Sequence, residues 1–323
     1  MTQRPKFVAP RQAPPGIWRR TPPMIFAPIC GLLGLALAWQ SMADASVLGA
    51  LSGLLDGAAV ALFLFAVLAY LSKVFRRPAV VIEEQETLPG LVGIGAGVLS
   101  IGLCAGVLAA YAPMAGRGML VIGLLALLWL IVTSLRQMAA AEEAIGPERQ
   151  FLSAGLLVAA AVAPMMGWPG LGRVLIWPGA GLALVLATIN LMQLRRHRVP
   201  KVLLPLMALH LVPVAAYGMA AVQLGAPFLL VACGLSFVGL LLLPVLALRA
   251  GSGLFLSVLT IPLGLSALLF AHLPPAFPGI GILPVLASLV LVAATLTCIP
   301  ATFLVMRDWA RGRLATSSNA AIA

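Results

Sequence analysis

Ten apolar runs, each long enough to cross a membrane as a helix, follow one another along almost the whole chain. A helix needs about 20 apolar residues to span the hydrocarbon core of a bilayer. The chain is 62% hydrophobic and only 9% charged, whereas a soluble domain carries about 25% charged residues. The runs are continuous rather than alternating, which argues against a transmembrane β-barrel. The sequence therefore predicts an all-α integral membrane protein, with spans at roughly 22–40, 47–72, 89–111, 117–136, 151–168, 171–193, 201–222, 226–248, 252–271 and 280–306.

The positions of the basic residues predict the orientation. If the ten spans alternate in direction, 18 of the 20 Lys and Arg residues fall on one side, and only Arg117 and Arg173 fall on the other. Loops rich in Lys and Arg stay in the cytoplasm. We therefore expect a multi-pass protein of a bacterial plasma (inner) membrane with both termini cytoplasmic. Residues 1–21 would be a disordered basic tail, 22–306 the transmembrane domain and 307–323 a C-terminal tail.

Prolines interrupt several predicted spans near their middle. The first, fifth, seventh and ninth spans carry one each: Pro28, Pro164, Pro213 and Pro262. The third span is rich in glycine, and the even-numbered spans are predicted to be smoother helices, with Pro244 and Pro284 as exceptions. A proline inside a helix frees the carbonyl four residues earlier, which is tolerated where it meets protein or a water-filled cavity.

This alternation predicts five helical hairpins, each an irregular inner helix followed by a straighter outer one. Five irregular helices in a ring can enclose a central pore. Proline is also common in membrane helices that merely kink for packing, and the prolines alone leave both interpretations open.

Three short motifs resemble the TehA family, the tellurite-resistance and dicarboxylate-transporter group that includes the slow anion channels of plant guard cells. The motifs are RTPPMIFAPICGLLGLALAW, ALHLVPVAAYGMAAV and SVLTIPLGLSALL. They are similar to the first, seventh and ninth helices of that family, and the resemblance runs from about residue 20 to residue 308.

The resemblance implies a fold and an activity. It implies five hairpins with quasi-fivefold symmetry about a pore lined by the odd-numbered helices, in a homotrimer whose protomers each have a pore. It also implies passive passage of small anions, although some members move organic acids or sulfite. A phenylalanine on the ninth helix plugs the pore of the channel members, and the matching residue here is Ile261.

Asp56 and His210 are the candidate ionisable groups within the predicted spans. Asp56 lies near the non-cytoplasmic end of the second span, where a capping or hydrogen-bonding role is favoured over proton coupling. His210, Val214 and Tyr217 share one helical face. If that face meets the pore, His210 could bind an anion or gain charge at low pH; otherwise it is a neutral histidine bonded to a nearby carbonyl.

Mild polarity would suit such a pore, because conduction requires weak binding. We expect Ser257 and Thr260, beside Pro262, to contribute it together with His210 and Tyr217. The partners implied are small inorganic or organic anions and membrane lipids. Nucleic-acid binding is not expected, because the net charge of +11 falls in loops where topology places it.

No cofactor, metal or enzymatic activity is expected. The four cysteines have no metal-binding spacing, and no nucleotide-binding motif occurs. Haem is not expected because His197 and His272 lie at opposite membrane ends. Two alternatives stay open. One is a proton-coupled organic-acid or sulfite carrier that uses Asp56 or His210, and the other is a non-transporting membrane subunit, which a closed bundle favours.

Overall fold

The computed structural model describes residues 20–43, 47–140, 145–195, 201–250, 253–318 and 320–322. These residues fold as helices, and no strand occurs among them. Nine of the helices described are long and apolar enough to cross a membrane, and α9 (Leu229–Ala250) contributes a shorter apolar stretch, Leu229–Pro244. The chain is therefore a multi-pass helical membrane protein. Residues 1–19 of the predicted basic tail lie outside the described part.

The other long helices are α1 (Phe26–Met42), α2 (Val47–Arg76), α4 (Leu88–Ala109), α5 (Pro113–Ala140), α6 (Gln150–Val162), α7 (Pro169–Arg195), α8 (Leu211–Leu224), α10 (Gly253–Ala276) and α11 (Ile282–Ala310). Short helices join or extend them: η2 (Pro23–Ile25), α3 (Val80–Gln85), η3 (Pro147–Arg149), η4 (Ala163–Met166), η5 (Lys201–His210) and α12 (Arg313–Ser317).

Burial divides the membrane segments into an inner and an outer set. In the segments built on α1, α4, α6, α8 and α10, between 61% and 83% of the residues are buried inside the protein. In α2, α5, α7 and α11 the share is only 22% to 28%. Outer helices of this kind expose their apolar side chains to lipid, while the inner helices pack against protein on nearly every side.

The inner helices contact one another in a closed cycle. α1 packs against α4, α4 against α6, α6 against α8, α8 against α10, and α10 returns to α1. Each outer helix packs on the inner helix that precedes it in the chain: α2 on α1, α5 on α4, α7 on α6, α9 on α8 and α11 on α10. We call the five inner helices the inner ring, and the line about which they are arranged its axis.

Glycines allow α1 and α10 to approach backbone to backbone. A Cβ atom placed on Gly264 would lie 2.2 Å from the carbonyl oxygen of Gly31, and one on Gly31 would lie 2.5 Å from the carbonyl oxygen of Thr260. Small residues are the usual means by which membrane helices pack closely. On α4, Gly95 and Gly97 likewise make room for the rings of Phe151 and Phe26.

Of the four prolines predicted to interrupt inner helices near their middle, only Pro262 lies well inside a continuous α-helix, α10. Pro28 and Pro213 are the third residues of α1 and α8, each just after a 3-10 segment, and Pro164 lies in η4 after the end of α6. A missing N–H costs little in a first turn, because the first four N–H groups of a helix have no partner within it.

The outer helices were predicted to be smoother, with Pro244 and Pro284 as exceptions, and the structure adds Pro178 and Pro300 inside helices of this set. Pro178, Pro244 and Pro300 lie within α7, α9 and α11, and all three are exposed on the outer surface of the bundle. Proline therefore occurs in helices of both sets and does not separate inner from outer.

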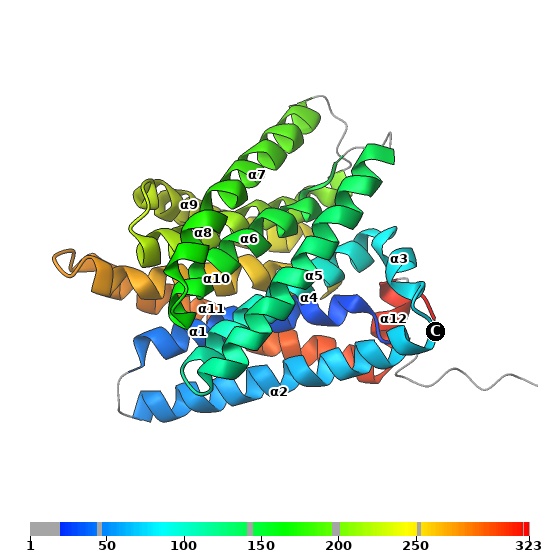
Figure 1. Cartoon of the computed structure of the whole chain (residues 1–323), viewed down its shortest axis with the longest axis horizontal. Helices are drawn as coiled ribbons and strands as arrows, with labels where there is room; N and C mark the ends of the chain where they lie inside the picture. Colours follow the sequence, from blue (N-terminus) through cyan, green and yellow to red (C-terminus); the bar gives the residue numbers. More distant parts are fainter. Residues whose placement is uncertain are drawn as a thin grey trace, which may run out of the picture.

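The two ends of the bundle differ in charge. One end carries Lys73, Arg149, Arg195 and Arg307, and we call it the basic end. Figure 1 shows α3 and α12 near each other at one end, beside the C-terminus. The chain from Arg307 to Ser317 is mostly helical, with Leu314 buried, where a plain C-terminal tail was predicted.

Candidate functional site

The axis of the inner ring is the candidate site, and the neighbours of α10 show which of its faces points there. Thr260 and Gly264 face α1, Leu269 packs on Gly218 of α8, and Phe270 faces α9. With 100° between successive residues, Ile261, Leu265 and Leu268 fall between the α1 face and the α8 face, away from α9. Their side chains therefore point toward the axis.

Small and weakly polar side chains of α1 and α4 complete this region. Cys30 and Ser41 lie at helical spacing on the face of α1 between α4 and α10, while Gly34 lies directly against Gly264 of α10. The Ser100 hydroxyl on α4 donates to the Ala96 carbonyl at 2.7 Å, and the Cys30 thiol on α1 is fully buried. These residues carry no net charge.

The axis is closed in this structure. Ile261 and Leu265 are 0% exposed, and Leu268 is 1% exposed, so no water reaches their side chains. Ile261 thus lies in a packed apolar layer shared with Leu265 and Leu268, rather than forming a single plug.

The predicted polar residues of α10 lie mainly at the contact with α1. The Thr260 hydroxyl donates to the Ser257 carbonyl at 2.6 Å and approaches the Ala27 carbonyl at 3.5 Å. The Thr260 carbonyl in turn accepts from the Cys298 thiol of α11 at 3.6 Å. Thr260 and Ser257 are both buried. Thr260 therefore helps to join three helices, whereas Ser257 lies close to the axis side.

The face that carries His210, Val214 and Tyr217 points away from the axis. These side chains are partly exposed, whereas Val212 and Met219 on the other side are buried. The Tyr217 hydroxyl donates to the Pro227 carbonyl at 2.6 Å. Nδ1 of His210 lies 3.0 Å from the Met207 carbonyl, which matches the expected neutral histidine bonded to a nearby carbonyl. The shared face was correctly predicted, but its direction was not.

A polar cluster that includes His272 lies at the end of the ring opposite the basic end. His272 follows Leu268 by four residues on the axis side of α10, and its Nδ1 donates to the Leu268 carbonyl at 2.9 Å. Its Nε2 lies 3.5 Å from the oxygen of the Ser41 hydroxyl, which donates to the Leu37 carbonyl at 2.8 Å. Sequence reasoning considered His272 only as a haem ligand; its helical spacing from Ile261 and Leu265 was the signal that places it on the axis.

Asp56 belongs to the same end but to an outer helix. One of its carboxylate oxygens accepts from the Tyr111 hydroxyl at 2.7 Å and from the Gln40 amide at 3.2 Å. The hydrogen bond to the Asp56 carboxylate raises the pKa of Tyr111. This arrangement fits the hydrogen-bonding role favoured from the sequence.

A buried ion pair at the basic end was missed by sequence reasoning. Lys73 pairs with Glu84, and the two side chains are 0% and 1% exposed. The Lys73 ammonium also donates to the Thr21 carbonyl at 3.1 Å, and the Tyr70 hydroxyl donates to Glu84 at 2.8 Å. Burial raises the pKa of the Glu84 carboxyl, and the Lys73 charge opposes that shift. The network connects α2, α3 and the segment that leads into α1.

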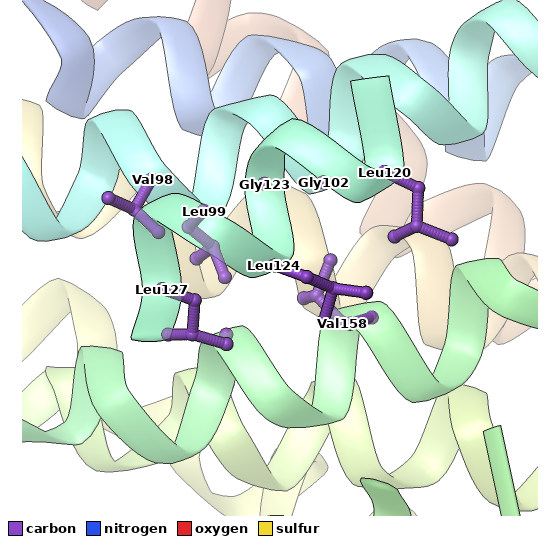
Figure 2. Close-up of a pocket in the computed structure, with 10 residues that line it drawn as sticks. Val98, Leu99, Gly102, Leu120, Gly123, Leu124, Leu127 and Val158 are labelled. Carbon is purple, nitrogen blue, oxygen red and sulfur yellow. The ribbon is translucent and has the colours of Figure 1, made fainter. Parts of the chain in front are cut away.

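A small cavity lies off the axis, between α4, α5 and α6 (Figure 2). Its volume is about 10 Å³ and its walls are apolar, so it is at the lower limit for one water molecule and offers that molecule no partner. Among the described residues, no three His, Cys, Asp or Glu side chains come together to hold a metal ion.

These features define a multi-pass helical membrane protein with a closed, uncharged axis and a polar cluster at each end. No protein-family model matches the sequence. No curated protein matches it either.

Proposed function

We propose that the protein is a passive conduit for small anions, with its path along the axis of the inner ring. The arrangement would be that of the TehA family, with five helical hairpins in quasi-fivefold order. The observation that carries this proposal is the closed cycle of contacts α1–α4–α6–α8–α10. If the five inner helices were not arranged around a common centre, they would not each be buried on nearly every side.

The chemistry along the axis suits weak, rapid passage. A fixed cation would hold an anion too tightly for conduction, which requires binding at sites that also release the ion. Cys30 and Ser100 supply weak polarity without charge. At the basic end, Arg149 and neighbouring cations would raise the local concentration of anions.

The apolar layer of Ile261, Leu265 and Leu268 would act as the gate. Hydrophobic constrictions close a pore by excluding water, and small outward shifts of side chains or of a helix open it. Pro262 lies inside α10, directly beside this layer. A proline lacks the N–H that would hold the preceding turn, so α10 has a local weak point for such a shift.

Reconstitution into proteoliposomes tests this proposal with a panel of chloride, nitrate, sulfite and dicarboxylates. We expect Ile261→Ala to raise anion flux severalfold and Ile261→Phe to lower it. Val214→Ala is the matched control, because Val214 lies on the outward face of α8. Equal flux in the parent and both Ile261 variants would remove Ile261 from the gate.

A non-transporting membrane subunit is the second candidate, and the filled axis favours it. In that case even Ile261→Ala combined with Leu265→Ala would pass no anion at any voltage or pH. The proton-coupled carrier has less support, because Asp56 lies on an outer helix and His210 faces outward. Location in a bacterial inner membrane, cytoplasmic termini and a homotrimer belong to the same proposal.

A further inference from the structure

A long groove lies on the outer surface of the bundle, over α10 and between α9 and α11. Its volume is about 1,210 Å³, which exceeds the roughly 300–1,000 Å³ of pockets for small molecules. Leucine is the commonest residue in its lining, and several leucines are well exposed: Leu241, Leu256, Leu289, Leu296 and Leu304. The side chains of Leu259 and Leu263 form its floor on α10.

The groove is as long as a bilayer core is thick. Its lining residues on α11 run from Leu286 to Asp308. At 1.5 Å per residue this distance is about 33 Å, and the hydrocarbon core is about 30 Å thick. Because the walls are apolar and face lipid, acyl chains can fill the groove along its whole length.

The groove ends in charged side chains at the basic end. Arg307, Asp308 and Arg313 line it there, together with Ser317 of α12. Arg313 forms an ion pair with Asp308, and Nε of Arg307 lies 3.9 Å from the same carboxylate. Two guanidinium groups thus share one carboxylate, which leaves an excess of positive charge where a lipid headgroup would lie.

We propose that this groove binds an anionic phospholipid, with its acyl chains along α9 and α11 and its phosphate at Arg307 and Arg313. Basic residues between membrane helices on one face of a bilayer are a known means of holding anionic headgroups. A second copy of the chain fits less well. Copies in one membrane share their orientation, so a neighbour would bring its own basic end against these arginines.

Native mass spectrometry of the full-length protein in mixed dioleoylphosphatidylglycerol and dioleoylphosphatidylcholine tests the headgroup site. Arg307→Gln and Arg313→Gln should each lower the preference for phosphatidylglycerol about fivefold, corresponding to roughly 1 kcal/mol per cation. Arg311→Gln is the matched control, because it removes the same charge from a residue outside the groove lining. An unchanged preference in the Arg307 and Arg313 variants, or an equal loss in the Arg311 variant, overturns the proposal.

A second pair of variants tests the acyl-chain site. Ala293 lines the groove, and Val292 beside it on α11 is 54% exposed but does not line it. Ala293→Phe should reduce the number of phospholipids retained, while Val292→Phe should not. If Ala293→Phe instead dissociates an oligomer and leaves lipid retention unchanged, the groove is a contact between copies and the lipid proposal is wrong.

Discussion

Replacing Lys73 or Glu84 alone should be costly, because each would leave the charge of the other buried. The side chains are 0% and 1% exposed, and the ion pair is supported by Thr21 and Tyr70. Removing one partner of a buried ion pair costs about 3–5 kcal/mol, since the remaining charge is uncompensated. We therefore expect Lys73→Met and Glu84→Gln each to lower the free energy of unfolding by roughly that amount.

The double variant Lys73→Met/Glu84→Gln should be much less costly than the two single changes added together. Replacing both charges of a buried pair with uncharged groups is often nearly neutral. The lost hydrogen bond to the Thr21 carbonyl, and an uncharged amide oxygen in place of a carboxylate as the acceptor for Tyr70, set the expected cost at about 1–2 kcal/mol. The difference between this value and the sum of the single costs measures how strongly the two residues act as one unit.

The assay is unfolding of the purified protein by sodium dodecyl sulfate in mixed micelles, followed by circular dichroism. Glu83→Gln is the control, because the Arg77–Glu83 pair beside it is 48% and 40% exposed. An exposed pair contributes at most about 1 kcal/mol. Single variants that each cost less than about 1 kcal/mol, or a double variant that costs the sum of the two, would show that water reaches the Lys73–Glu84 pair. Either result would contradict its description as a buried ion pair.

The dependence on pH gives an independent check. Burial raises the pKa of Glu84, and in Lys73→Met no ammonium opposes that shift. A carboxyl with a raised pKa in the folded state binds more protons there than in the unfolded state. Stability of Lys73→Met should therefore fall as the pH rises from about 4.3, the ordinary pKa of Glu, toward the raised value. Glu84→Gln in the same background should abolish this fall.

Three further substitutions, with Leu125→Ala as a control, follow from the packing and hydrogen bonds, and all are measured by the same unfolding assay. Gly264→Ala brings a Cβ atom to 2.2 Å from the Gly31 carbonyl oxygen, and we expect a loss of about 1–3 kcal/mol because backbone must move. Tyr111→Phe removes the 2.7 Å hydrogen bond to Asp56 and should cost about 1 kcal/mol, since the tyrosine is largely exposed. Leu127→Ala enlarges the cavity of Figure 2 and should cost about 2 kcal/mol. This value is at the low end for core leucines, because a leucine in a membrane protein leaves apolar lipid rather than water when it becomes buried. Leu125→Ala, at a side chain 63% exposed on the same helix, should cost less than about 0.5 kcal/mol.

Helix positions could be predicted from the sequence because apolar length alone decides which segments cross a bilayer. The division into inner and outer helices was also correct, but for an unreliable reason. Pro178 and Pro300 lie in outer helices, so proline is not the signal. Glycines such as Gly31 and Gly264 are a better sequence signal, because only small residues allow two helix backbones to meet, as these two do.

The side-chain geometry of the candidate site was harder to predict. Helical spacing placed His210 and Tyr217 on one face, but spacing carries no information about which way that face points. Glu84 pairs with Lys73 because α3 turns back against the end of α2. A lysine in a last turn followed by acids in a short connection is a detectable pattern, although only the fold shows which acid becomes buried.

Chemical block of the axis is the most direct test of the central claim. In a background with the four native cysteines replaced, Leu265→Cys would be introduced together with Ile261→Ala, so that the gate is wide enough for reagent and anion. Modification by a charged methanethiosulfonate reagent should then abolish the raised anion flux, while the same treatment of Val214→Cys should leave it intact. Undiminished flux through protein whose Leu265→Cys site is fully modified would contradict a path along the axis of the inner ring.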